Sequence, residues 1–444
     1  MKSSSTRLFH LASLGCARNQ VDSEIMLGRL AEAGWAHIDD PSEAHVIVVN
    51  TCCFITDAAD ESIDAILELA RYKEAGACHT LIVTGCLPER YREQTAASLP
   101  EVDVFLGTGA YDRIIDAVTG SLPRASCLLP DPDRIALQSA GTPRDAGGAP
   151  FAYIKIAEGC SRQCTYCIIP KLRGRQKSRP AADIVTEAAA LSRQGIKELI
   201  LVAQDTTAYG LDRDGKHGLA DLLSQLAAGC PDTWIRLLYG HPESLGMDVI
   251  DVMGRFPNLC RYVDIPIQHA SDPVLRRMGR RYGQKDLLRL FDDIRQRLPG
   301  VALRTTIITG FPGETDADVA VLQDLVARVR FDHLGVFIYS DADDLPSHGL
   351  PGHVPAAVAR RRSDALMQQQ LDISAAINEA RRGSLLDVLV EENPEPGLFM
   401  GRTMFQAPEV DGLTIIHGQG LKKGGIYRIR VVDSLEYDLI GEPE

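Results

Sequence analysis

Apolar runs alternate with helical stretches over the first 120 residues of the chain. The runs are LFHLASL, VIVVN and TLIVTG, and each is followed by a segment with apolar residues at helical spacing. This alternation is typical of an open parallel α/β sheet with helices on both faces. Such sheets bind their ligands beyond the carboxyl ends of the strands. We therefore expect an N-terminal α/β domain over residues 7–125, with its functional residues at that edge.

Six further strand candidates follow a segment rich in Pro and Gly, residues 126–149, which is typical of a linker. They are FAYIKIAEG, KELILVAQ, WIRLLYG, YVDIPIQ, ALRTTIITG and HLGVFIYS, and helical stretches such as AADIVTEAAALSRQG separate them. Strands spaced in this way predict a partial (β/α) barrel over residues 150–382, which ends in a trailing helix. Its active site would lie at the carboxyl ends of the strands.

The last segment, residues 383–444, has the pattern of a small antiparallel β-barrel. Its short runs LLDVLVEE, LTIIHG and IYRIRVVD are broken by Gly and Pro. Small barrels of this kind often bind nucleic acid. Here, however, eleven Asp and Glu face five Lys and Arg. This balance repels phosphate and attracts a basic partner.

Three cysteines at CxxxCxxC spacing, Cys160, Cys164 and Cys167, lie in the run GCSRQCTYC. Three thiolates can hold three irons of a four-iron cluster and leave the fourth iron open, whereas most iron–sulfur sites have four cysteines. A zinc site would need a second ligand pair, and the next histidine is the distant His217. Buried structural thiols are disfavoured by the polar residues between the cysteines. The spacing therefore predicts a cluster with chemistry at its open iron.

A second cysteine triple follows from the topology. Cys16, Cys52 and Cys86 come directly after the three N-terminal apolar runs, in LASLGC, VVNTC and IVTGC. The carboxyl ends of parallel strands meet at one edge, so these thiols should converge and could hold a second cluster. The alternative is three loop cysteines without a function. Cys53 should point the opposite way and be packed.

Composition sets limits on the class of protein. The chain has 444 residues, of which 45% are hydrophobic and 24% charged, as in a soluble protein of two or three domains. The N-terminus lacks the pattern of a signal peptide and no run approaches a membrane span, so we expect a cytoplasmic protein. Its eleven cysteines should then be thiols or metal ligands.

The formal net charge of −13 argues against a broad surface that binds nucleic acid. A local basic run follows the cysteine loop and would either bind nucleic acid or form a solvated charged face. Its members are Lys171, Arg173, Arg175, Lys177 and Arg179.

Two cysteine triples followed by a small β-barrel resemble the methylthiotransferase family of radical S-adenosylmethionine (SAM) enzymes, over nearly the whole chain. One bacterial branch of this family modifies a tRNA adenosine, and the other modifies an aspartate of a ribosomal protein. The strings SLGCARNQVDSEIMLGRL, VNTCCFITDAADES, GCLPERY, IKIAEGCSRQCTYCIIPKLRGRQKSRP and GRTMFQAPEVDG are similar to the second branch. Residues 341–355 depart from the family's shorter acidic segment, so no functional residue is carried across them.

The resemblance implies two 4Fe-4S clusters and two SAM molecules per turnover. On Cys160, Cys164 and Cys167, the catalytic cluster would reduce SAM to a 5′-deoxyadenosyl radical, which takes a hydrogen from the aspartate β-carbon. The cluster on Cys16, Cys52 and Cys86 would hold the sulfur for insertion, and a second SAM would supply the methyl group.

The resemblance also implies partners. The substrate would be the twelfth small-subunit ribosomal protein, which is strongly basic and suits the acidic C-terminal TRAM-like barrel. A reductant protein of flavodoxin or ferredoxin type and a sulfur donor would be needed, with no membrane, and RNA contact is less expected. Two alternatives stay open: a tRNA-adenosine methylthiotransferase, and an iron–sulfur scaffold without turnover.

SAM contacts are expected at the barrel's carboxyl mouth, beside the cysteine loop and after strands. Each candidate could instead be a turn or capping residue, and the Gly-x-x-Gly of GFPGET is a weak signal. By position the candidates are Glu158, Gly159, Tyr166, Gln204, Asp205, Thr309, Gly310 and Phe311. His269, in PIQHAS, could face the cavity or be a hydrogen-bonded loop histidine.

Overall fold

The computed structural model describes residues 7–215 and 218–444, so His217 lies outside the described residues. The chain divides into two compact units. Unit 1 comprises Met1–Gly147, Ala157–Gln163 and Cys167–Arg179, and unit 2 comprises Gly148–Ile156, Cys164–Tyr166 and Pro180–Glu444. Each unit is described by itself below.

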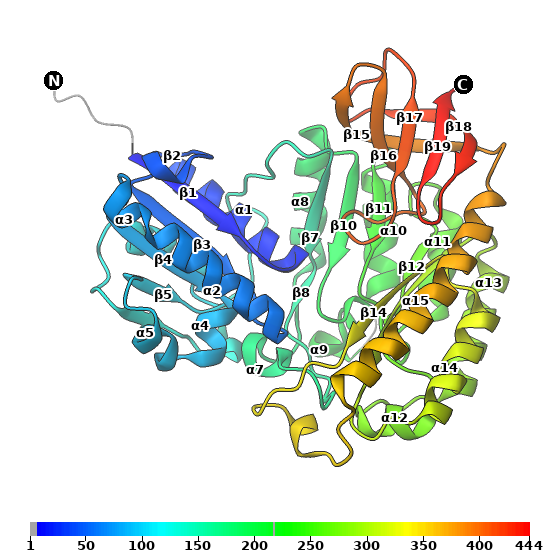
Figure 1. Ribbon diagram of the computed structural model, residues 1–444. Coiled ribbons are helices and arrows are strands. Elements are labelled where there is room, and N and C mark those ends of the chain that lie inside the picture. Colours follow the sequence, from blue (N-terminus) through cyan, green and yellow to red (C-terminus); the bar gives the residue numbers. More distant parts are fainter. Residues whose placement is uncertain (1–6, 216–217) are drawn as a thin grey trace. The chain divides into compact units, whose positions relative to one another are not determined.

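Unit 1 is built on a six-stranded parallel sheet in the order β2-β1-β3-β4-β5-β6 (Figure 1). The expected open parallel α/β sheet is confirmed, and the three apolar runs form β1, β3 and β4. Three short strands extend it, and β6 takes up the first residues of the segment expected to be a linker. The strands are β1 (Arg7–Ser13), β2 (Trp35–His37), β3 (Val46–Thr51), β4 (Thr80–Gly85), β5 (Val104–Leu106) and β6 (Ser126–Leu128).

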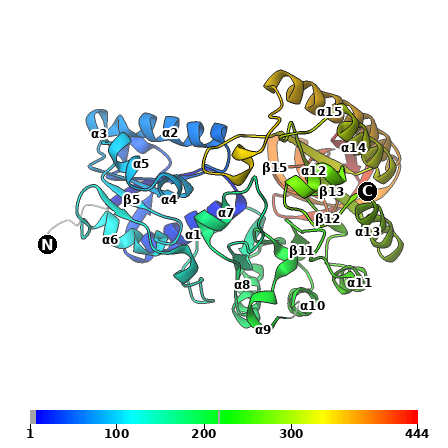
Figure 2. The same ribbon diagram turned by 90° about the horizontal axis from the view of Figure 1, so that it is seen from below.

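Helices cover both faces of this sheet, as Figure 2 shows for α1 and α6 on one side and α2 on the other. Met26 and Leu30 of α1 pack with Ile114 of α6 against Phe9 and Val48 of the sheet. The long helices are amphipathic because one face meets the sheet. The helices are α1 (Ala17–Glu32), α2 (Thr56–Ala70), α3 (Tyr72–Ala75), α4 (Cys86–Tyr91), α5 (Glu93–Ser98), α6 (Ile114–Val118) and α7 (Ile169–Arg173), with the 3₁₀ turns η1 (Pro41–Glu43), η2 (Tyr111–Arg113) and η3 (Pro132–Arg134).

Unit 2 contains the six expected barrel strands, all paired in parallel. They form two three-stranded sheets, β11-β10-β7 and β12-β13-β14. A parallel bridge between Ile235 and Leu259 links β11 to the segment before β12, so the strands follow one another as in a partial barrel. The strands are β7 (Phe151–Lys155), β10 (Glu198–Val202), β11 (Trp234–Leu237), β12 (Tyr262–Asp264), β13 (Ala302–Thr309) and β14 (His333–Ile338).

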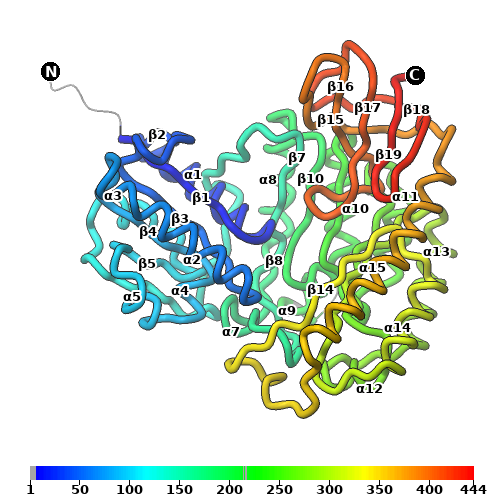
Figure 3. Tube along the Cα trace, in the orientation of Figure 1, coloured from blue at the N-terminus to red at the C-terminus, as the bar shows by residue number. Residues whose placement is uncertain are grey.

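The helices of unit 2 lie along the outside of these strands, and α15 is the expected trailing helix (Figure 3). They are α8 (Ala181–Arg193), α9 (Leu211–Asp214), α10 (Leu219–Gly229), α11 (Met247–Arg255), α12 (Asp272–Arg277), α13 (Gln284–Arg297), α14 (Asp316–Val329) and α15 (Ala356–Glu379), with η4 (Thr206–Ala208) and η5 (Pro346–Gly349). Among the described residues, no helix combines the length and the low polarity that a membrane span requires.

The C-terminal segment is a closed five-stranded barrel in the order β15-β16-β17-β19-β18. The expected small barrel is confirmed, but it is not wholly antiparallel, because β17 and β19 pair in parallel where β19 closes the ring. Val388, Val390, Phe399, Ile416 and Ile429 fill its core. The strands are β15 (Leu385–Glu395), β16 (Leu398–Thr403), β17 (Thr414–His417), β18 (Ile426–Ser434) and β19 (Leu439–Pro443).

The string APEVDG, residues 407–412, connects β16 to β17 and docks on the amino ends of the partial-barrel strands. Asp411 accepts a hydrogen bond from Tyr262, the first residue of β12, and pairs with Arg304 of β13 at 3.3 Å. Glu409 accepts one from Tyr153 of β7 at 3.3 Å. This loop therefore has a structural role at the barrel end opposite the carboxyl mouth.

A buried ion network supports the same junction. Glu198, the first residue of β10, lies between Arg236 of β11 at 2.6 Å and Arg402 of β16 at 2.5 Å. Burial raises the pKa of this carboxyl, but the two guanidinium groups outweigh it and hold the pKa below its usual range. The C-terminal barrel is thus joined to the partial barrel through paired charges.

Candidate functional site

The N-terminal cysteine triple lies at one edge of the parallel sheet. Cys16, Cys52 and Cys86 follow β1, β3 and β4, and β3 lies between the other two strands. The loops approach closely, because a Cβ placed on Gly15 would lie 3.2 Å from the Sγ of Cys52. The Sγ of Cys86 lies 4.0 Å from the Oδ1 of Asn19, whose amide nitrogen hydrogen-bonds the loops that carry Cys16 and Cys52, so the structure brings these three thiols together, as the topology predicts.

Two glycines allow the close approach of these loops. Gly15 and Gly85 precede Cys16 and Cys86 and have φ angles of +94° and +97°. Residues with a Cβ rarely adopt this conformation. A Cβ on Gly15 would also lie 2.7 Å from the Cβ of Cys52, which is too close for any side chain. Larger residues here would separate the thiols.

Polar side chains hold the cysteine loops in place. Asn19 of α1 donates hydrogen bonds to the carbonyl oxygens of Leu14 at 3.0 Å and Thr51 at 2.8 Å. Ser62 of α2 accepts from the Cys52 N–H and donates to the Cys52 carbonyl oxygen. Neither residue is distinguished by the sequence pattern, although Asn19 follows Cys16 closely in the string SLGCARNQ.

Arg173, the last residue of α7, reaches the same thiols. Its side chain is 3% exposed, and its Nη2 lies 3.7 Å from the Sγ of Cys86. The guanidinium also pairs with Asp22 and Glu158 and donates to Asn19. It is therefore part of the thiol site.

The basic run after the cysteine loop is consequently no continuous basic face. Arg173 and Arg179 are buried, at 3% and 1% exposed, and Arg179 donates to the carbonyl oxygen of Gln138. Lys177 donates to the carbonyl oxygen of Pro132. Both interpretations offered by the sequence, a nucleic-acid patch and a solvated charged face, are therefore wrong for Arg173 and Arg179, whereas Lys171 and Arg175 are exposed.

The three thiols of the triple differ in how readily they ionise. Burial raises the pKa of Cys86 to about 11, although the nearby Arg173 opposes this. Burial also raises the pKa of Cys52. At Cys16 burial is outweighed by Arg18, Arg173 and the N–H groups at the start of α1, so its pKa is lowered. A metal centre that binds all three as thiolates must displace protons.

The CxxxCxxC loop is anchored locally at its first cysteine. Cys160 is buried, and its N–H donates to the carbonyl oxygen of Gly174 at 3.0 Å. The N–H of Arg162 donates to the Cys160 Sγ at 3.5 Å. Cys164 and Cys167 are half-buried. All eleven cysteines of the chain are free thiols.

Within the described residues, no three His, Cys, Asp or Glu side chains are spaced to hold a single metal ion. A cubane cluster carries its irons at separate corners, so its thiolates lie farther apart than the ligands of one ion. Three thiols on three strand ends, beside a buried cation, fit such a cluster better than a zinc site.

The candidates for SAM contacts divide between the two units. In unit 1, Glu158 is buried and pairs with Arg173. Gly159 has a φ of +82°, and a Cβ added to it would clash with the carbonyl oxygen of Arg175. In unit 2, the hydroxyl of Tyr166 accepts from Arg280 at 2.5 Å, and its ring packs edge-on against Phe311. Tyr166 thus has a fixed orientation within the cysteine loop.

The candidates after β10 and β13 make internal contacts. Asp205 caps η4 through the Ala208 N–H and accepts from Thr207. Gly310 donates its N–H to Glu314 at 2.9 Å. Thr309 and Phe311 are fully buried and Gln204 is half-buried. His269 is fully buried, and its Nδ1 accepts a hydrogen bond from the Ser271 N–H at 2.9 Å, which fits a hydrogen-bonded loop histidine.

Residues 341–355, whose sequence departs from the family pattern, pack on the part of the cysteine loop that lies in unit 2. The N–H of Ser347 donates to the carbonyl oxygen of Thr165 at 3.0 Å. Tyr339 donates to the hydroxyl of Ser347 and its ring packs against Phe311. The segment therefore supports the residues around Cys164, which the sequence did not reveal.

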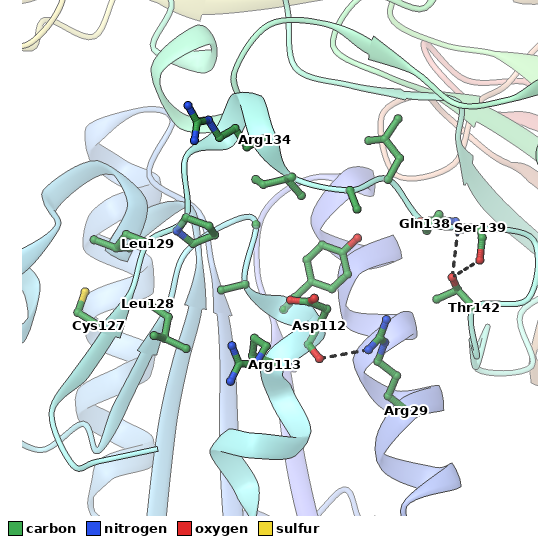
Figure 4. Close-up of a pocket in the computed structure, with 17 residues that line it drawn as sticks. Arg29, Asp112, Arg113, Cys127, Leu128, Leu129, Arg134, Gln138, Ser139 and Thr142 are labelled. Carbon is green, nitrogen blue, oxygen red and sulfur yellow. Dashed lines mark hydrogen bonds between the residues drawn. The ribbon is translucent and has the colours of Figure 1, made fainter. Parts of the chain in front are cut away.

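A pocket of about 630 Å³ opens in unit 1 near the carboxyl ends of β5 and β6 (Figure 4). Arg29, Tyr111, Arg113 and Gln138 are part of its lining, and Arg29 donates to the Asp112 carbonyl oxygen. No expected ligand or SAM contact is among its described lining residues.

Three segments of the chain match models of known protein families. Residues 8–107 match the profile described as uncharacterized protein family UPF0004, residues 154–326 the Radical SAM superfamily, and residues 383–443 the TRAM domain. The structure of the radical SAM methyltransferase TsrM from Kitasatospora setae is similar with a TM-score of 0.57 and 15% identity, over 84% of this chain and 90% of that chain. OxsB, a cobalamin-dependent radical enzyme, is similar with a TM-score of 0.53 and 14% identity, over 83% and 56%.

The fold and these matches define a radical SAM protein with an N-terminal UPF0004 domain and a C-terminal TRAM domain. A relative from Desulfosudis oleivorans, named ribosomal protein uS12 methylthiotransferase RimO, is 54% identical over 98% of this chain and 99% of its own length. Relatives of the same name from Lachnoclostridium phytofermentans and Clostridioides difficile are 45% and 43% identical, each over 97% of this chain and 99% and 98% of their own lengths. The chain belongs to the RimO family.

Proposed function

We propose that this chain is a radical SAM methylthiotransferase that adds a methylthio group to the β-carbon of an aspartate in ribosomal protein uS12. The observation that carries this proposal is the identity of 54% with a uS12 methylthiotransferase over nearly the full length of both chains. The tRNA-adenosine alternative is not favoured, because the relatives named above are uS12 enzymes.

The two cysteine triples are the proposed ligand sets of two 4Fe-4S clusters. Bound there, the clusters would supply the electron that cleaves SAM and the site that holds the sulfur. The set of CxxxCxxC spacing is Cys160, Cys164 and Cys167, and the set at the sheet edge is Cys16, Cys52 and Cys86. At the sheet edge, the N-terminus of α1 and the Arg173 guanidinium offset negative charge on the thiolates.

We also propose how the SAM candidates divide their tasks. Within unit 2, Tyr166 and Gln204 would contact SAM through side chains, and Gly310 through its backbone at positive φ. Gly159, also at positive φ, would allow the turn that precedes Cys160. The others would hold these loops in shape. Glu158 pairs with Arg173, and Asp205 caps η4. Thr309 and Phe311 are buried and pack inside the unit.

The TRAM domain is the proposed docking surface for the basic substrate. Eight of its acidic residues are exposed, against four of its basic residues, so its surface potential favours a cationic partner. The acidic residues are Asp387, Glu392, Glu395, Glu409, Asp433, Glu436, Glu442 and Glu444, and the basic residues are Lys422, Lys423, Arg428 and Arg430. A flavodoxin- or ferredoxin-type reductant and a sulfur donor would complete the reaction in the cytoplasm.

A competition assay tests this function. The reconstituted protein receives SAM, reductant, sulfide and equal amounts of isolated uS12 and tRNA, and mass spectrometry follows both substrates. The expected result is replacement of one hydrogen by SCH₃ on a uS12 aspartate. A gain on tRNA alone would show the other branch, and absence of 5′-deoxyadenosine from fully reconstituted protein would show a scaffold.

A further inference from the structure

Arg173 makes polar contacts with four groups inside unit 1. Nη1 donates to Asp22 at 2.9 Å and to Glu158 at 3.3 Å. Nη2 donates to Asn19 Oδ1 at 2.6 Å and lies 3.7 Å from the Sγ of Cys86. One planar guanidinium thus contacts the start of α1, the residue that leads into Gly159 and Cys160, and a thiol of the sheet edge.

The chemistry of the guanidinium explains why an arginine suits this place. Burying a charge is costly unless it is paired and hydrogen-bonded. Asp22 and Glu158 provide that pairing, so a permanent cation is retained where the side chain is only 3% exposed. The guanidinium stays protonated at any working pH and holds its donors in a rigid fork. One edge of this fork meets carboxylates and the other meets Cys86.

The backbone after Arg173 ties the same helix to the CxxxCxxC loop. The carbonyl oxygen of Gly174 accepts from the Cys160 N–H at 3.0 Å. On the other side, the hydroxyl of Thr108 donates to the Leu172 carbonyl oxygen at 2.7 Å. The end of α7 is therefore held between the N-terminal domain and the first cysteine of the loop.

We propose that Arg173 is a positioning residue that raises the reduction potential of the cluster on Cys16, Cys52 and Cys86 and fixes the Glu158–Cys160 segment beside those thiols. This inference rests on the proposed function, since it requires a cluster at the sheet edge. Hydrogen bonds and charge near a ligating sulfur tune the potential of an iron–sulfur cluster. A cation beside Cys86 stabilises the reduced cluster, which carries one more negative charge.

A redox titration of the N-terminal cluster alone tests the proposal. The parent protein carries Cys160→Ala, Cys164→Ala and Cys167→Ala, so that electron paramagnetic resonance reports a single cluster. Arg173→Gln removes the charge, Arg173→Lys keeps it, and Arg175→Gln is the matched control, because Arg175 is exposed in the same segment. Iron and sulfide content is measured for each variant.

Arg173→Gln is expected to shift the midpoint potential to a more negative value, with Arg173→Lys between it and the parent and Arg175→Gln unchanged. An unchanged potential in Arg173→Gln at equal iron content would overturn the proposal. If Arg173→Gln binds no cluster, the result for Arg173→Lys is decisive. A cluster in Arg173→Lys would support the role of the charge, and a folded Arg173→Lys protein without iron would overturn it. A parent that binds no iron would instead refute the cluster in the proposed function.

Discussion

The carboxylate of Asp411 accepts a 2.6 Å hydrogen bond from the hydroxyl of Tyr262, and both side chains are fully buried. This bond joins the loop between β16 and β17 to the amino end of a partial-barrel strand. The expected chemistry lies at the opposite, carboxyl ends of these strands. The TRAM domain therefore contacts the end of the partial barrel opposite the one where we propose the SAM site.

Asp411→Ala should destabilise this junction. It removes the acceptor of the buried Tyr262 hydroxyl, which costs about 1–3 kcal/mol, whereas Arg304 keeps its ion pair with Asp264 at 3.0 Å. Denaturant unfolding followed by fluorescence should show a lower midpoint. Asp387→Ala is the matched control, because its ion pair with Arg428 is exposed and should contribute less than about 1 kcal/mol. Equal midpoints for both variants would contradict a structural role for the APEVDG loop.

Gly15→Ala should impair the N-terminal cluster through crowding. The added Cβ would lie 2.7 Å from the Cβ of Cys52. In the background without the CxxxCxxC cysteines, iron content should fall clearly below that of the parent.

Gly34→Ala controls for backbone strain in that experiment. Gly34 also has a positive φ, but an added Cβ would meet no atom within 4 Å. Both substitutions cost about 1–2 kcal/mol of strain, so only crowding differs between them. Equal iron content in the two variants would contradict the proposed ligand triple.

The thiols of the triple should ionise in a defined order in metal-free protein. The pKa of Cys16 is lowered by Arg18 and Arg173 despite its burial, whereas burial raises that of Cys86 to about 11. Only the thiolate reacts with iodoacetamide. The Cys16 alkylation rate should therefore level off at lower pH than that of Cys86, which should still rise near pH 10.

Peptide mass spectrometry across a pH series would give both profiles. The shape of each profile, rather than its absolute rate, separates ionisation from access. In urea the two profiles should coincide near the ordinary thiol pKa of about 8.5. Coincident profiles in the folded protein would contradict the described electrostatics.

Much of the fold could be predicted from the hydrophobic pattern, and so could the convergence of Cys16, Cys52 and Cys86. Strand ends in a parallel sheet share an edge, so strand assignment alone places these residues. The burial of Arg173 could not be predicted, because a run of basic residues has the same sequence pattern whether its side chains are exposed to solvent or buried in an ion network. Its partner Asp22 lies 151 residues away along the chain, and only folding brings the two together.

The parallel pairing of β17 with β19 was likewise beyond the sequence. A short strand such as β19 has an apolar pattern that does not specify the direction of its neighbour. The docking of APEVDG also depends on partners in β12 and β13, far away along the chain.

We propose that the two cysteine triples perform separate tasks in one methylthio transfer. This division of tasks is tested by measuring 5′-deoxyadenosine and methylthiolated uS12 together, for the wild-type chain, Cys160→Ala, Cys52→Ala and Cys53→Ala. Cys53 is the matched control, since it adjoins Cys52 but is fully buried and is not a proposed ligand. Cys160→Ala should form neither product, Cys52→Ala should form 5′-deoxyadenosine without methylthiolated protein, and Cys53→Ala should form both. Full methylthiolation by Cys52→Ala would contradict the claim.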